Sequence, residues 1–165
     1  MTQTNEKEWV KLGNAYPICD LGWSNNVKLW DFSLSATFRA SIGGKAFNQM
    51  RAVYESVNEF GLKNVLASWL DEPEFTGRVV YCSKYLEDAS FLKLDNLTLA
   101  YNVPLKNRKV VKSLSFSLTG QNLFTLTAYK GVDPEVSRSG LTPGIEGLSY
   151  YPRTRVFTFG ASIKF

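Results

Sequence analysis

The chain has 165 residues, of which 44% are hydrophobic and 21% charged, and this composition fits one ordered domain better than a disordered chain. No run of about 18 apolar residues occurs, which excludes a transmembrane helix but leaves open membrane strands of alternating polarity. The net charge of +4 forms no basic patch interleaved with aromatics, and histidine is absent. Nucleic-acid binding is therefore not expected, and histidine-based catalysis and His-containing zinc sites are excluded.

The first predicted strand spans residues 11–23 and is the weakest, because Pro17 and Gly22 interrupt it. A tight turn is predicted at Ser24 to Asn26. The next strand, 28–42, is the clearest: from Trp30 to Ile42, apolar residues alternate without a break with Ser, Thr, Asp31 and Arg39. Soluble strands average about 5–6 residues, whereas a tilted membrane strand needs about 9–11.

Residues 43–89 form a long connection that we expect to be partly helical. Apolar residues from Phe47 to Val57 have helical spacing, and Gly61 is a suitable helix end. The carboxylates Asp71, Glu72 and Glu74 lie too close in sequence, and without a second partner, to predict a glycosidase pair. We expect a solvated acidic loop and no enzymatic activity.

The strand 90–103 changes phase. Its apolar residues lie at even positions before Asp95 and at odd positions after Asn96, which predicts a β-bulge there. Pro104 ends this strand and begins a short connection to Lys112. The following strand, 113–129, again alternates, with Ser, Thr and Gln on its polar face.

The second long connection, 130–153, contains the stretch "KGVDPEV". Asp133 and Glu135 are open to two interpretations: a cation or ligand site, or a turn whose backbone Asp-Pro fixes. The last strand, 154–165, alternates up to the terminal Phe165. The connections thus run short, long, short, long, which is typical of an outer-membrane barrel with short periplasmic turns and long outer loops. Trp30, Tyr101 and Tyr129 near strand ends fit an interfacial aromatic belt.

Several ordered motifs resemble one family. The stretches "SFLKLDNLTLAYNVP", "GQNLFTLTAYKGVDPEV" and "YYPRTRVFTFGASIKF" resemble the C-terminal region of SusC-like TonB-dependent transporters of Bacteroidetes outer membranes. The upstream stretch "YPICDLGWSNNVKLWDFSLSATFRASIGG" resembles the preceding region of that family. Ala100 stands where the family usually has glycine, and Lys93 where it usually has arginine.

The resemblance implies an all-β fold: about the last five antiparallel strands of a transmembrane β-barrel of about 22 strands, with two long extracellular loops. The plug domain and the TonB-contacting segment would be absent from this chain, so we expect it to be one piece of a larger assembly. The C-terminus would be periplasmic and the long loops extracellular. The whole protein would import oligosaccharides or peptides with energy supplied through TonB.

The expected partners are the remainder of the barrel and plug, outer-membrane lipid, TonB through the absent part, and a SusD-like surface lipoprotein. No cofactor and no metal is expected. Candidate contacts with substrate or with that lipoprotein are Trp69, Tyr81, Tyr85, Tyr150 and Tyr151. Two alternatives stay open: a soluble β-sandwich that binds carbohydrate, and a truncated fragment without function. Cys19 and Cys82 have no metal-like spacing, and we expect two unpaired thiols.

The resemblance also implies that the terminal aromatic strand carries a signal read by the barrel-assembly machinery, with Phe157, Phe159, Ile163 and Phe165 on one face. Deleting Phe165 in the full-length protein is expected to impair outer-membrane assembly. The measurement is the amount of folded, heat-modifiable barrel in the outer membrane, and an unchanged amount would contradict the prediction.

Overall fold

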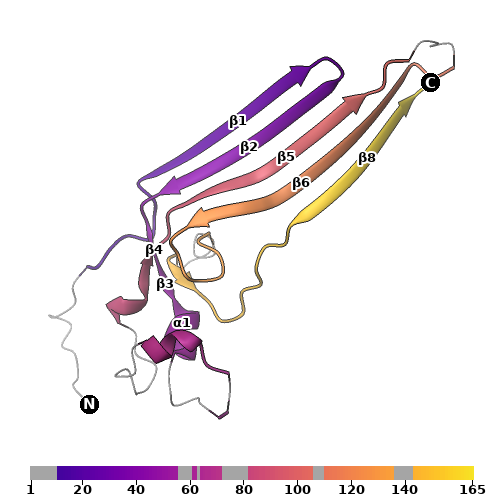
Figure 1. Cartoon of the computed structure of the whole chain (residues 1–165). Helices are drawn as coiled ribbons and strands as arrows, with labels where there is room; N and C mark the ends of the chain where they lie inside the picture. The colour runs from indigo at the N-terminus through magenta and orange to yellow at the C-terminus, as the bar shows by residue number, and fades with distance from the viewer. Residues whose placement is uncertain (1–10, 56–60, 63, 72–81, 106–109, 136–142) are drawn as a thin grey trace, which may run out of the picture.

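The computed structural model describes residues 11–55, 61–62, 64–71, 82–105, 110–135 and 143–165. Its main feature is a long, curved antiparallel sheet of five strands in the order β1-β2-β5-β6-β8 (Figure 1). The strands are β1 (Cys19–Leu29), β2 (Phe32–Ile42), β5 (Phe91–Asn102), β6 (Ser113–Thr127) and β8 (Val156–Lys164). The predicted all-β fold is confirmed.

The connections divide between the two ends of this sheet. The β1–β2 and β5–β6 connections lie at one end, which we call the turn end, together with the C-terminus (Figure 1). The long β2–β5 and β6–β8 connections lie at the opposite end, the loop end. The predicted alternation of short and long connections therefore corresponds to two distinct ends of one sheet.

The loop end carries a small second sheet in the order β4-β3-β7, in which β3 and β7 run parallel. Its strands are β3 (Lys45–Asn48), β4 (Leu86–Asp88) and β7 (Ile145–Glu146). The short helix α1 (Gln49–Tyr54) follows β3, and Asn48 caps it by accepting a hydrogen bond from the Arg51 amide at 3.0 Å. The turns η3 (Ala67–Asp71) and η4 (Ser83–Tyr85) complete this region. The expected helical part of the connection is thus present, and none of the described helices is long and apolar enough to cross a membrane.

The first strand and its turn differ from the prediction. Residues 24–26 are not a turn: Asn25 pairs with Ala36 in the middle of the β1–β2 ladder, and the chain turns at Trp30 and Asp31. Trp30 has a φ of 51°, the left-handed conformation that two-residue hairpin turns require. Extending β1 to Leu29 keeps its alternation in phase with β2, and this long-range pairing outweighs the turn preference of the two asparagines.

The predicted bulge is confirmed. Thr37 of β2 pairs with Asn96, but its neighbour Phe38 pairs with Leu94, so Asp95 is an extra residue relative to β2. The β5–β6 register shifts at the same place. Strand β6 accommodates this shift at Asn122, whose φ is 53°.

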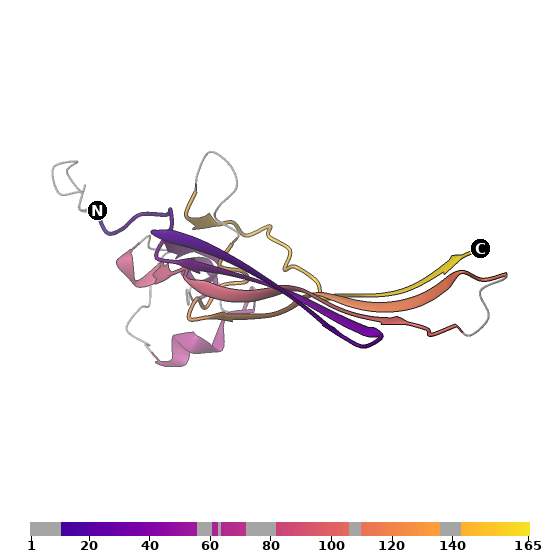
Figure 2. The ribbon, with the colours of Figure 1, turned by 90° about the horizontal axis from the view of Figure 1, so that it is seen from above.

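Register brings the apolar residues of all five strands to one face, the apolar face. These residues are Leu21, Trp23, Val27, Leu29, Phe32, Leu34, Phe38, Leu92, Leu94, Leu97, Leu99, Phe116, Leu118, Phe124, Leu126, Phe157, Phe159 and Ile163. Many are exposed: Phe159 by 70%, Trp23 by 61% and Leu118 by 52%. No second sheet covers this face in the part of the chain that the structure describes, and Figure 2 shows the sheet extending beyond the loop region.

The opposite face, the polar face, carries mainly Ser, Thr and Asn. Cross-strand hydroxyl contacts occur there, such as Thr98 to Thr119 at 3.0 Å and Ser24 to Thr37 at 3.1 Å. A soluble sandwich would bury the apolar face against a second sheet, and the described residues instead leave it exposed. The buried residues are concentrated at the loop end, where Ala46, Ala89 and Tyr129 form a small core.

The two faces give a testable difference. Replacing Leu118 with Arg in the full-length protein puts a charge on the apolar face, which we expect to contact lipid, and should cost about 2–4 kcal/mol if the site is near the bilayer midplane. Ser115→Arg, in the same strand on the polar face, is the control and should have a small effect. Unfolding midpoints in lipid vesicles measure both, and equal losses would contradict a lipid-facing apolar side.

Candidate functional site

The polar face carries a cluster of six charged side chains at the loop end. Two strands of the main sheet, the connection after β6 and the stretch before β8 all contribute to it. We call this the charge cluster, and its members are Arg39, Lys93, Asp95, Asp133, Glu135 and Arg153.

The first ion pair of the cluster joins Arg39 of β2 to Asp95 of β5. Arg39 Nε lies 2.8 Å from Asp95 Oδ2, and Arg39 Nη2 lies 3.1 Å from Oδ1. This two-pronged contact is the strongest arrangement available to arginine and a carboxylate. Asp95 is the extra residue of the β5 bulge, so the bulge positions this carboxylate beside β2.

Lys93 is the most deeply buried member, with only 1% of its surface exposed. A buried cation is unfavourable unless carboxylates or other acceptors surround it. The connection after β6 supplies them: Glu135 Oε2 lies 2.6 Å from Lys93 Nζ, and Asp133 Oδ1 lies 3.6 Å away. The ring of Phe91 adds a cation–π contact at 5.5 Å.

Glu135 forms ion pairs with three cationic side chains. Besides Lys93, Arg153 Nη1 lies 2.9 Å from Oε2, and Arg39 Nη1 donates a hydrogen bond to Oε1. Burial alone would raise the pKa of Glu135, but the hydrogen bonds and charges of Lys93 and Arg39 outweigh burial. The pKa of this carboxyl therefore lies below its ordinary value.

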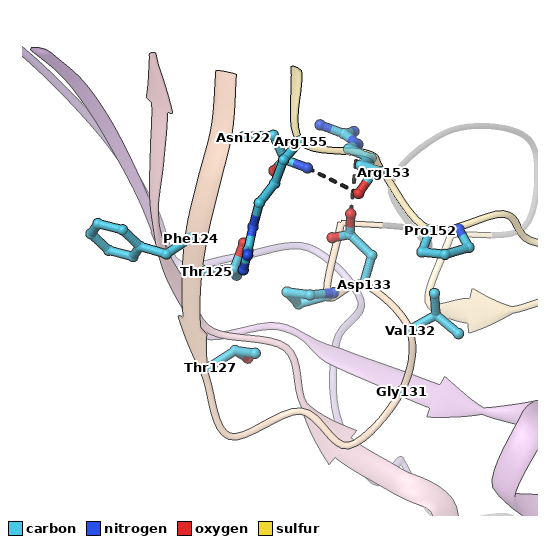
Figure 3. A pocket seen from close by; sticks show the side chains of 11 residues that line it. Asn122, Phe124, Thr125, Thr127, Gly131, Val132, Asp133, Pro152, Arg153 and Arg155 are labelled. Atoms are coloured by element: carbon cyan, nitrogen blue, oxygen red, sulfur yellow. Dashed lines mark hydrogen bonds and ion pairs between the residues drawn. The ribbon is translucent and has the colours of Figure 1, made fainter. Parts of the chain in front are cut away.

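A cavity of about 270 Å³ opens beside the cluster, between the loop end of β6 and the stretch before β8 (Figure 3). It shares Asp133 and Arg153 with the cluster and adds Arg155, Thr125 and Asn122. The ladder between β6 and β8 ends at Gln121 and Val156, and beyond that point the two segments separate to form the cavity.

Asn122 sets one margin of this cavity. Its side-chain nitrogen donates to the carbonyl oxygens of Arg153 at 3.1 Å and Thr154 at 3.2 Å. Figure 3 shows Arg155 lying along β6 on the cavity side, whereas Phe124 points away from it. The left-handed backbone of Asn122 and its two side-chain bonds together hold the stretch before β8 against β6.

A second buried carboxylate, Glu146 of β7, fixes the start of the same connection. It is fully buried, accepts a hydrogen bond from the hydroxyl of Tyr129, and accepts another from the Val132 amide at 3.0 Å. Burial and this hydrogen bond raise the pKa of Tyr129. A Cβ at Gly131 would collide with Glu146 and the Tyr129 ring, so only glycine fits there. Tyr129 is only 6% exposed, so its predicted place in an interfacial belt is wrong.

A third set of ion pairs attaches α1 to the small sheet. Arg51 lies 2.6 Å from Glu55 and 2.5 Å from Glu87, and Glu87 also accepts from the Lys130 amide at 2.7 Å. Ser68 donates to Glu55 at 2.7 Å. The two long connections are therefore joined to each other at the loop end.

Among the predicted contact residues, the structure describes the side chains of Tyr85, Tyr150 and Tyr151. Tyr85 is buried in η4, where its ring meets Phe47 edge-on at 6.4 Å, while Tyr151 is 77% exposed and Tyr150 half-buried. Trp69 belongs to η3, but its side chain, like the whole of Tyr81, lies outside the described residues.

The terminal-strand residues do share a face, as predicted. Phe157, Phe159 and Ile163 pair with Gly120, Leu118 and Leu114 of β6 on the apolar face. Phe165 follows the strand and is 75% exposed. Their role as an assembly signal stays a prediction.

The carboxylates Asp133 and Glu135 fit neither sequence interpretation fully. Asp133 does fix the turn, since it accepts from the Glu135 amide at 2.9 Å, but both carboxylates also neutralise the buried cation of Lys93. Within the described residues, no group of three or more His, Cys, Asp or Glu side chains is arranged to hold a metal. Cys19 and Cys82 are both free thiols, as expected.

The pKa of Glu135 predicts how stability depends on pH. Because its folded-state pKa lies below the unfolded value of about 4.3, its contribution is present at neutral pH and is lost as pH falls through the folded-state pKa. The protection of residues 129–135 against hydrogen exchange, relative to the intrinsic rate at each pH, should therefore fall in the full-length protein below about pH 4. In Glu135→Gln this acid-induced change should be reduced, and an identical change in both proteins would contradict the assignment.

The comparisons with known proteins give relatives over most of the chain. It is 30% identical to TonB-dependent receptor P26 and 29% identical to TonB-dependent receptor P3, both of Formosa agariphila, over 94% and 93% of its length. It is 30% identical to TonB-dependent receptor SusC of Bacteroides thetaiotaomicron over 88%. The matched region is 18%, 17% and 15% of these relatives, so the chain spans less than a fifth of their length.

Solved structures give the same result. The RagAB peptide importer in its closed-closed state matches with a TM-score of 0.81 and 25% identity, over all of this chain and 19% of that one. A second RagAB peptide transporter structure matches with a TM-score of 0.72 and 27% identity, over 87% of this chain and 17% of that one. No family model matches the chain. With relatives named as TonB-dependent receptors, SusC among them, along most of its length and a sheet that superposes on the RagAB transporter, the chain is homologous to a segment of the SusC-like TonB-dependent receptors.

Proposed function

We propose that this chain is the C-terminal barrel segment of an outer-membrane importer that takes up oligosaccharides or peptides. The observation that carries the proposal is the sheet itself. One face is apolar and exposed along all five strands, and the other carries Ser and Thr, which is the pattern of a wall between lipid and a water-filled lumen. The relatives named SusC and RagAB support import as the activity of the whole protein.

In this proposal the loop end is extracellular and the turn end periplasmic. Outer-membrane barrels have short periplasmic turns and long outer loops, and the two ends of this sheet differ in that way. The C-terminus, at the turn end, is then periplasmic. The segment contributes three things: barrel wall, lumen lining, and two outer loops.

The remaining parts of the mechanism lie in the rest of the protein. Five strands leave open edges at β1 and β8, and an open sheet cannot span a bilayer. The other strands of a barrel of about 22, a plug and a TonB-contacting segment would complete it. A SusD-like surface lipoprotein would cover the outer loops, where Tyr150, Tyr151 and the other predicted aromatics are its candidate contacts or substrate contacts.

Orientation can be tested in cells with epitope tags in the full-length protein. A tag after Gly147, which has open space around it, should bind antibody on intact cells. A tag between Trp30 and Asp31, at the opposite end of the sheet, should bind only after the outer membrane is permeabilised. The reverse pattern, or labelling of neither tag in membranes, would contradict the proposed topology.

Import is tested by deleting the gene and growing cells on oligosaccharide or peptide mixtures as the limiting nutrient. Growth on one class should fall and return with the full-length gene but not with a gene lacking the plug region. Normal growth on both classes would favour a non-functional fragment.

A further inference from the structure

Three cationic side chains converge on the single carboxylate of Glu135. Lys93 Nζ and Arg153 Nη1 lie 2.6 Å and 2.9 Å from Oε2, and Arg39 Nη1 donates to Oε1. The same arrangement of ammonium and guanidinium groups is what proteins use to hold the carboxylate of a ligand.

The cluster is neutral only because Glu135 is present. Arg39 has a second partner in Asp95, and Lys93 and Arg153 each lie 3.6 Å from Asp133. The cluster therefore holds three cations and three carboxylates. Without Glu135, three cations and two carboxylates remain, a net charge of +1 around a lysine that is 1% exposed. The buried surroundings would then favour the binding of an anion from solution.

Glu135 also lies outside the strands of the main sheet. Arg39, Lys93 and Asp95 belong to strands β2 and β5, whereas Glu135 belongs to the connection after β6. The sheet thus supplies the fixed part of an anion site, and the connection supplies the carboxylate that fills it.

The neighbouring cavity gives this site a route to solvent. Its volume of about 270 Å³ is several times the share of one water molecule in the liquid, about 30 Å³. Arg153 lines both cavity and cluster. Arg155 lines the cavity as well, and no ion pair joins it to a carboxylate of the described residues. A carboxylate in the cavity would therefore meet positive charge before it reached the cluster.

We propose that Arg39, Lys93 and Arg153 form a carboxylate-binding site that Glu135 occupies as a built-in ligand. We further propose that the carboxylate of an acidic solute, entering through the cavity, exchanges with Glu135. The built-in site is independent of import. The exchange rests on the proposed function, because it assumes that the polar face lines the path of an imported solute.

The test is chemical rescue of the full-length receptor purified in detergent. Glu135→Ala removes the built-in carboxylate and should lower the melting temperature. Sodium acetate should restore half or more of that loss at concentrations about 100-fold above its Kd, because a ligand that binds only the folded state stabilises it. Sodium chloride at the same ionic strength and acetamide, which has the same shape without the charge, should restore much less.

Two control proteins make the result specific. The wild type should respond little to acetate, because Glu135 already fills the site. Glu135→Ala combined with Lys93→Met lacks the buried cation and should lose the response. If Glu135→Ala does not fold during expression, refolding yield into the heat-modifiable form, with acetate against acetamide, replaces the melting temperature. Equal effects of acetate and acetamide, or an equal response of the wild type, would overturn the proposal.

The exchange step has its own probes. Glucuronate and N-acetylglycine present the carboxylates of a sugar acid and of a peptide, and either one, added to the wild type, should lower the protection of residues 129–135 against hydrogen exchange by displacing Glu135. The solute that does so at the lower concentration is the favoured source. No effect of either on the wild type, while acetate rescues Glu135→Ala, would overturn the exchange step and leave the built-in site standing. Because none of these measurements depends on import, failure of the import experiment would not alter their results.

Discussion

The burial of Lys93 is the constraint on which the loop end depends. A lysine in the wall of a sheet, almost wholly covered, requires carboxylates close by. Those carboxylates come from a connection that is distant in sequence, so neutralising one side chain fixes the path of the chain after β6. Arg153 then holds the stretch before β8 to the same carboxylates, and Asn122 holds its backbone. The long connection after β6 is consequently attached to the sheet by ion pairs and does not lie independently of it.

Hydrophobicity organises the rest of the sheet in a different way. The apolar residues do not gather into a core but spread over one face, and the buried core is small and confined to the loop end. In the proposed barrel, such a sheet would obtain most of its hydrophobic stabilisation from its surroundings, from lipid on one side and from neighbouring strands at each edge. The loop end, by contrast, is held largely by buried charges, with Glu135, Glu146 and Glu87 each joining two segments.

Local periodicity is sufficient to predict most of the main sheet. The strands β2, β6 and β8 can be predicted from their alternation, and the bulge from a change of phase at Asp95. The prediction for β1 is wrong because two asparagines favour a turn locally, while pairing with β2 decides the register. The charge cluster cannot be predicted in this way, since Glu135 lies 42 residues from Lys93 and 96 from Arg39 in the chain. The only signal is a pair of cations on the polar side of two strands, and that signal does not identify their partners.

The bulge at Asp95 determines which deletions strand β5 can tolerate. Strand β5 reverses its alternation at that residue, so Lys93 lies on the same side as Thr98 although their positions differ in parity. Deleting the single codon for Asp95 would remove the extra residue and make β5 regular against β2, so Lys93 would stay on the polar side, although Arg39 would lose its Asp95 partner. Loss of two residues there would therefore do more damage than loss of one, because it would turn Lys93 toward the apolar side. The face on which each side chain lies depends on the number of residues in the strand rather than on their kind.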